Sequence, residues 1–194
     1  MTSVSRETQN KLESYVQLLH SWDRRISLIG PSHRVVDLQR LTAEAQELHT
    51  VIPQIRSRWM DLGSGNGLPA IPLLIWRQGL EDEVTFVESD VRKSAFLRAA
   101  LRAANLTATV RPSRIEAIRP HQAHFLTVRA LASLDRLFGY AAMHLVPVGK
   151  LYALKGVHAD AEIAEAERNW NAEIKTYGLD GGGVIVEASQ ISRR

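Results

Sequence analysis

The chain has 194 residues, of which 45% are hydrophobic and 23% charged, a balance typical of one ordinary globular domain. Cysteine is absent, which excludes disulfides and thiolate metal sites and favours a cytoplasmic protein. The sequence contains neither a long apolar run nor an apolar signal core, so no transmembrane helix, secretion signal or membrane partner is expected.

The first fifty residues have helical periodicity. Apolar residues recur at helical spacing up to a break at Gly30-Pro31, namely Leu12, Tyr15, Val16, Leu19 and Trp22. A second helix is predicted over residues 34–50. Because neither helix can bury its apolar face alone, residues 1–55 are expected to form a helical cap on a core domain of residues 56–194.

From residue 58 onward, predicted strands alternate with predicted helices. Strands are expected at residues 59–62, 84–88, 107–110, 124–128 and 150–154, and helices at 69–78, 91–104, 134–145 and 159–170. Two further strands, 173–177 and 184–188, flank a triple-glycine turn with no helix between them. This order predicts an α/β fold with a mostly parallel sheet and an antiparallel edge.

A glycine-rich turn follows the first predicted strand, where a doubly wound sheet binds its ligands. Gly63, Gly65 and Gly67 allow a sharp turn and close approach of a ligand. Glu88 ends the second strand, about where an acid accepts hydrogen bonds from ribose hydroxyls. The third glycine comes too early for the dinucleotide pattern G-x-G-x-x-G, and the turn carries no lysine or arginine for a phosphate. S-adenosylmethionine fits better, and the whole pattern resembles a class I (Rossmann-like) methyltransferase.

Five segments then occur in order with matching gaps: DLGSGNGLPAIPL, VESDVRKSAFLR, SRIEAI, VRALASLD and LYALKG. Together with YVQLLHSWDRRISLIG, they resemble the RsmG (GidB) family of bacterial 16S ribosomal RNA guanine-N7 methyltransferases over nearly the whole chain. The resemblance implies S-adenosyl-L-methionine as methyl donor, S-adenosyl-L-homocysteine as product, and 16S ribosomal RNA as partner, free or within a small-subunit assembly particle. We expect the chain to act as a monomer.

The segments that match the family also indicate candidate site residues by their position. The resemblance implies cofactor contacts at Gly63, Leu68, Ile115, Glu116 and Arg129, to which the physical interpretation of the turn adds Gly65, Gly67 and Glu88. Arg129 and Lys155, which follow predicted strands, are the candidate catalytic residues. A structural salt bridge is the alternative for Arg129, and a solvated strand end is the alternative for Lys155. The histidines form no tight cluster of metal-site type, so no metal site is expected.

One helix departs from the family pattern. Where Arg-His-x-x-Asp-Ser is usual, this chain has Arg40-Leu41-Thr42-Ala43-Glu44-Ala45. The histidine and serine are missing and the acid is a glutamate, so roles assigned to those positions do not carry over.

Basic residues concentrate between residues 90 and 114, where Asp90 is the single acid. The candidates for contacts with RNA phosphates are Arg92, Lys93 and Arg98, together with Arg24 and Arg25. The alternative is a set of scattered, solvated charges.

Guanine N7 carries a lone pair and no proton. Methyl transfer by direct in-line attack therefore needs no general base, and positioning should dominate catalysis. Two alternatives stay open: a class I methyltransferase acting on a small molecule or protein, and an RNA-binding module with a vestigial cofactor pocket. The basic segment and the extent of the resemblance argue against the first. The glycine turn, Glu88 and Arg129 together argue against the second.

Overall fold

The computed structural model describes residues 5–29 and 38–194, with the backbone alone for residues 38–41. The helices are α1 Arg6–Asp23, α2 Leu38–Val51, α3 Ala70–Trp76, α4 Val91–Ala103, α5 Leu134–His144 and α6 Ala159–Asn169, with a short 3-10 helix at Ile115–Ala117. The strands are β1 Arg58–Leu62, β2 Glu83–Val87, β3 Thr109–Arg111, β4 Ala123–Arg129, β5 Leu145–Lys155, β6 Trp170–Gly178 and β7 Val184–Arg193. The predicted start of the second helix at residue 34, and the side chains of Arg40 and Leu41, lie outside the described residues.

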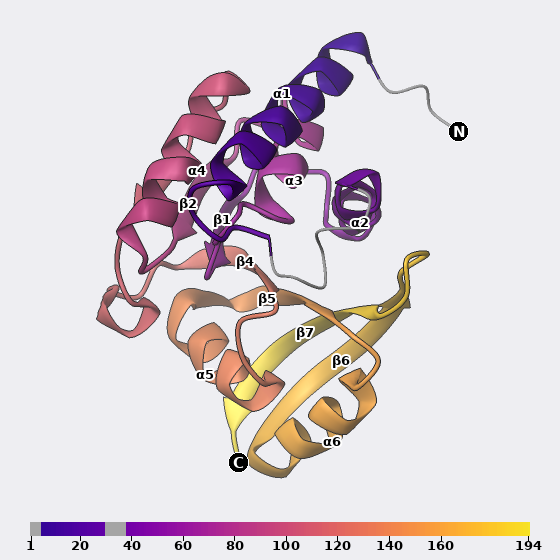
Figure 1. Cartoon of the computed structure of the whole chain (residues 1–194). Coiled ribbons are helices and arrows are strands. Elements are labelled where there is room, and N and C mark those ends of the chain that lie inside the picture. The colour runs from indigo at the N-terminus through magenta and orange to yellow at the C-terminus, as the bar shows by residue number, and fades with distance from the viewer. Residues whose placement is uncertain (1–4, 30–37) are drawn as a thin grey trace.

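The strands form one sheet in the order β3-β2-β1-β4-β5-β7-β6 (Figure 1). The first five of these strands pair in parallel, and β7 pairs antiparallel with both β5 and β6. The prediction of a mostly parallel sheet with an antiparallel edge is confirmed. β7 extends beyond the predicted residue 188, because the polar residues after Ala188 continue the backbone pairing with β6 although they bury little apolar surface.

Successive side chains of each strand point to opposite faces of the sheet, so the core has two layers. On one face Trp59 stacks on Phe125, with ring centroids 5.3 Å apart, and helices α1, α3 and α4 pack there. On the other face Met60 and Leu126 pack against α5 and α6. Figure 1 shows the two helical layers on opposite sides of the sheet.

The N-terminal helices share the first of these cores. Tyr15 and Leu19 of α1 and Leu48 of α2 are fully buried in the same cluster as Trp59. Both helices therefore contribute to this core, while the division into a cap of residues 1–55 and a core domain of residues 56–194 stays a prediction. None of the helices in residues 5–29 and 38–194 is long and apolar enough to cross a membrane.

Candidate functional site

The glycine turn after β1 has a left-handed backbone at each of its glycines. The φ angles are +65° at Gly63, +49° at Gly65 and +84° at Gly67, a region that side chains disfavour. A Cβ atom at Gly63 would lie 2.6 Å from Leu131 Cδ1, and one at Gly67 would lie 2.5 Å from Ile71 Cδ1. Backbone conformation therefore favours glycine at both positions, and close packing adds to it at Gly67, because Ile71 is fully buried, whereas the Leu131 side chain beside Gly63 is exposed and can move.

Glu88 follows directly after β2 and holds this turn in place. Its Oε2 accepts a hydrogen bond from the Gly65 N–H at 2.8 Å, and its Oε1 accepts one from the Asp90 N–H at 2.7 Å. The residue is only 8% exposed. The carboxylate thus fastens the glycine turn to the start of α4.

Asp61 is buried in β1 beneath the same turn. Its Oδ1 accepts a hydrogen bond from Thr127 Oγ1 of β4 at 2.5 Å. Burial raises the pKa of this carboxyl group to about 7. Asp61 can therefore gain or lose a proton near neutral pH.

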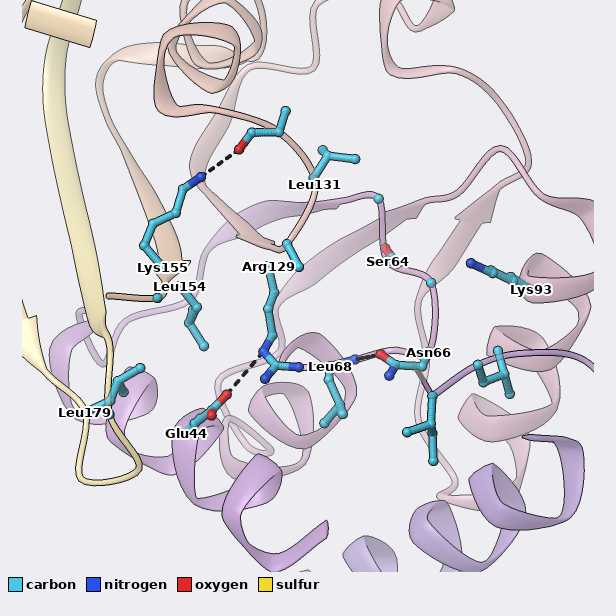
Figure 2. A pocket seen from close by; sticks show the side chains of 18 of the residues that line it. Glu44, Ser64, Asn66, Leu68, Lys93, Arg129, Leu131, Leu154, Lys155 and Leu179 are labelled. Carbon is cyan, nitrogen blue, oxygen red and sulfur yellow. Dashed lines mark hydrogen bonds and ion pairs between the residues drawn. The ribbon is translucent and has the colours of Figure 1, made fainter. Parts of the chain in front are cut away.

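A pocket of about 830 Å³ opens at the carboxyl ends of β1, β4 and β5 (Figure 2). This volume lies in the range of about 300–1,000 Å³ that is usual for small-molecule sites. The pocket combines apolar and charged side chains, among them Leu68, Leu131, Leu154, Leu179, Glu44, Lys93, Arg129, Lys155 and Glu162. Such a lining suits a ligand that has both apolar and charged parts.

Arg129 ends β4 and points into the pocket (Figure 2). Its Nε lies 3.2 Å from Oε2 of Glu44, which comes from α2. The next residue, Ala130, has a φ of +50°, so the chain turns sharply away from the strand. A strained backbone beside a pocket is common at functional sites.

Lys155 ends β5, the strand that pairs with β4, and also lines the pocket. Its Nζ donates to the backbone carbonyl of Ala132 and to Oε2 of Glu162, both at 2.6 Å. Glu162 Oε2 also accepts from the Leu134 N–H at 3.0 Å. The ammonium group therefore connects the β4–α5 loop to α6.

The structure brings some of the predicted site residues together and leaves others apart. Those that line the pocket are Gly63, Gly65, Leu68, Arg129 and Lys155, together with Lys93. Gly67 and Glu88 lie outside the lining, where they support the turn.

Ile115 and Glu116 also lie outside the lining. Ile115 is buried in the second core. Glu116 accepts hydrogen bonds from Tyr140 Oη and Arg136, and the Tyr140 bond is the main cause that lowers the pKa of this carboxyl to about 2.

The basic candidates differ in what surrounds them. Arg24 and Arg25 are exposed just after α1, and the Arg92 side chain is 74% exposed. Lys93 lines the pocket beside the glycine turn (Figure 2). Two of the guanidinium groups are partly engaged within the protein: Arg98 donates to the backbone carbonyl of Val110 at 3.2 Å, and Arg92 donates to Asp90 Oδ2 at 3.3 Å.

Sequence reasoning missed several lining residues. Glu44 could have been recognised as a candidate, since it occupies an acid position of the family pattern. Its pairing with Arg129, 85 positions further along the chain, could not be inferred from the sequence. Leu28, Ile29 and Leu179 also line the pocket from segments that carry no recognisable ligand motif.

Comparison with protein families gives a match over most of the chain. The family described as GidB, rRNA small subunit methyltransferase G, matches residues 8–178. The chain is 40% identical to the ribosomal RNA small subunit methyltransferase G of Gluconobacter oxydans, an alignment that covers 100% of this chain and 99% of that one. It is 41% identical to the protein of the same name from Paracoccus denitrificans, over 95% of this chain and 96% of that one.

Solved structures resemble the fold at low sequence identity. A SAM dependent methyltransferase from Aquifex aeolicus matches with a TM-score of 0.66 and 12% identity, over 82% of this chain and 98% of that one. A methyltransferase from Pyrococcus furiosus matches with a TM-score of 0.63 and 12% identity, over 94% of this chain and 98% of that one. At this identity the likeness shows the fold alone, which is that of class I methyltransferases.

Proposed function

Because the chain belongs to the GidB family of rRNA small subunit methyltransferases G, we propose that it methylates N7 of a guanine in 16S ribosomal RNA with S-adenosylmethionine as donor. The observation that carries this proposal is the left-handed glycine turn, held by Glu88, at the mouth of a pocket that Arg129 enters. The cytoplasmic location predicted from the sequence agrees with a ribosomal RNA substrate.

The pocket fits S-adenosylmethionine in shape and in charge. Gly63 and Gly65 expose backbone where a ligand can approach closely, and Leu68, Leu131 and Leu154 offer apolar contacts. Arg129 supplies a guanidinium, which binds carboxylates well, and the methionine part of the donor ends in a carboxylate. The turn itself contains no basic side chain for a phosphate.

The proposed methyl transfer needs no general base. S-adenosylmethionine supplies an electrophilic methyl group, and guanine N7 is a nucleophile without a proton. The work left to the protein is to hold the two partners in line and to exclude water. Residues of the pocket walls, including Leu131 and Leu154, are placed to exclude water.

We assign different roles to the two candidate catalytic residues. Arg129 enters the pocket and is proposed to contact the cofactor. Lys155 is proposed to position the β4–α5 loop, because both of its hydrogen bonds go to protein groups around that loop. For Ile115 and Glu116, which lie outside the pocket lining, the direct contact that the resemblance implied stays a proposal.

RNA contacts are proposed at exposed arginines and at Lys93, which lines the pocket. Arg92, Lys93, Arg24 and Arg25 are placed to meet phosphates, whereas Arg98 is the weaker candidate because of its bond to β3. We propose that a monomer acts on 16S ribosomal RNA, free or in a small-subunit assembly particle.

Calorimetry with S-adenosylmethionine tests the cofactor site. Gly63→Ala should weaken binding, because its Cβ displaces Leu131 and occupies space in the pocket lining. Gly79→Ala is the matched control: Gly79 has a φ of +95° but open space around the added Cβ, outside the lining. Each variant should lose about 1 kcal/mol of stability from left-handed backbone strain. Equal affinity in Gly63→Ala and the wild type would remove the turn from the cofactor site.

A further inference from the structure

One wall of the pocket comes from the N-terminal helical segment. Leu28 and Ile29, which follow α1, line the pocket, and both of their N–H groups donate to Oδ1 of Asp23, at 2.9 and 2.8 Å. Tyr15 Oη of α1 donates to the carbonyl of Asn66 in the glycine turn at 2.7 Å. The segment therefore reaches the proposed cofactor site directly.

Helix α2 contacts two further sides of the pocket. Glu44 pairs with Arg129 at the end of β4. One turn later, Glu47 Oε2 accepts a hydrogen bond from the Asp180 N–H, beside the lining residue Leu179. The helix is thus held against both the end of the sheet and the β6–β7 turn.

The Glu44–Arg129 pair is largely removed from water. The Glu44 side chain is 6% exposed and the Arg129 side chain 19% exposed. A buried guanidinium is costly without a counter-charge, so the carboxylate makes this position of Arg129 possible. A contact at Nε also restrains the plane of the guanidinium, whose donors form a rigid fork. In Figure 2 the guanidinium lies between Glu44 and Leu68.

We infer that Glu44 is the positioning residue for Arg129, and that through this pair α2 completes the cofactor site. The inference rests on the proposed function. The carboxylate of Glu44, which also lines the pocket, contacts Arg129 at Nε and leaves the Nη donors for the carboxylate of S-adenosylmethionine. Glu44 acts through Arg129 and touches no reacting atom.

A purely structural ion pair, which only ties α2 to the sheet, predicts different behaviour. In that case, loss of the charge lowers the unfolding temperature and leaves cofactor affinity in the folded protein unchanged. If Glu44 positions Arg129, affinity falls in a protein that remains folded. Glu44→Gln keeps the size of the side chain and removes its charge, whereas Glu44→Asp keeps the charge on a shorter stem.

The test is a double-mutant cycle with S-adenosylmethionine as the titrant. Dissociation constants are measured by calorimetry for the wild type, Glu44→Gln, Arg129→Gln and the double variant, with thermal unfolding to confirm that each is folded. Glu44→Gln should raise the dissociation constant about tenfold, and the double variant should bind no worse than Arg129→Gln alone, since the two residues act as one unit. Glu44→Asp should restore most of the affinity. Glu165→Gln, an exposed change of equal charge on α6, should bind like the wild type.

Two results would overturn the inference while the wild type still binds S-adenosylmethionine. One is a folded Glu44→Gln, or a folded Glu44→Ala if the former does not fold, whose dissociation constant and maximal rate match those of the wild type. The other is a double variant in which the separate effects multiply, which would make the residues independent. Absence of binding by the wild type would instead overturn the proposed function.

Discussion

The carboxylate of Glu88 accepts a hydrogen bond from the backbone N–H of Gly65 over 2.8 Å. This bond joins the end of β2 to the turn after β1, the two points between which a class I methyltransferase is expected to hold its cofactor. Because the other Glu88 oxygen accepts from the Asp90 N–H, both oxygens are engaged with backbone donors. The same side chain that we expect to meet the ribose therefore also shapes the turn.

Glu88→Gln should weaken S-adenosylmethionine binding at least tenfold. The glutamine amide can accept from one of the two N–H groups, but its NH₂ then faces the other donor, and a buried unsatisfied group costs about 1–3 kcal/mol. Calorimetry and urea unfolding measure the two effects. Asp90→Asn is the control, because asparagine also caps a helix and the change of charge is equal. Similar affinities for Glu88→Gln and Asp90→Asn would contradict the role of Glu88.

Lys155→Met should lower stability and activity together. Removal of the ammonium leaves Glu162 and the Ala132 carbonyl without their partner, at about 1.5–3 kcal/mol for each hydrogen bond to a charged group. Lys150→Met is the control on the same strand, since Lys150 pairs with Glu187 and is 35% exposed. Denaturant unfolding and the maximal methylation rate should both show the larger loss for Lys155→Met. A loss of rate at unchanged stability would instead indicate that the ammonium takes part in the chemistry.

Asp61 should make stability depend on pH. Burial raises its pKa to about 7, above the ordinary 3.8, so the folded chain keeps a proton that the unfolded chain releases. The stabilising contribution of this proton is complete below about pH 4 and is lost as pH rises through about 7. Asp61→Asn retains an acceptor for Thr127 and cannot ionise. The unfolding free energy of the variant relative to wild type should therefore rise from about pH 4 to 7 and then level off; a difference that is constant with pH would refute the assignment.

Arg92 and Arg98 lie on the same helix and should respond differently to substitution. Arg92→Gln should reduce the slope of log affinity for 16S ribosomal RNA against log salt by about 0.7, the value for one phosphate contact on a single strand. Arg98→Gln should change the slope little and lower stability, because Arg98 donates to the Val110 carbonyl. Filter binding over a range of salt concentrations measures both slopes. Equal changes in the two variants would mean that the surface acts through net charge alone.

Local chemistry explains how much of the fold could be predicted. The glycines of the turn, the acid that ends β2 and the alternation of strands and helices are short-range patterns, and the structure confirms the sheet that they predict. The length of β7 was underestimated, because backbone pairing with β6 continues through Ser189 and Ser192, whose side chains give no strand signal.

The pocket was less predictable because its wall comes from distant segments. The pairing of Glu44 with Arg129 depends on how α2 packs on the sheet, which no local spacing encodes. For Glu116 the cofactor contact stays a prediction; the bond from Tyr140 to its carboxylate, which joins residues 24 positions apart, could not be inferred from the sequence.

The central claim is tested most directly by methyl transfer from radiolabelled S-adenosylmethionine to ribosomal RNA, followed by identification of the modified nucleoside. Free 16S ribosomal RNA and small subunits, both from cells that lack this methylation, are compared with 23S ribosomal RNA. We predict that label enters 16S RNA at a single guanine, recovered as 7-methylguanosine, in the free RNA or in the subunit. Label in another nucleoside, in 23S RNA alone, or in neither RNA despite cofactor binding would contradict the account.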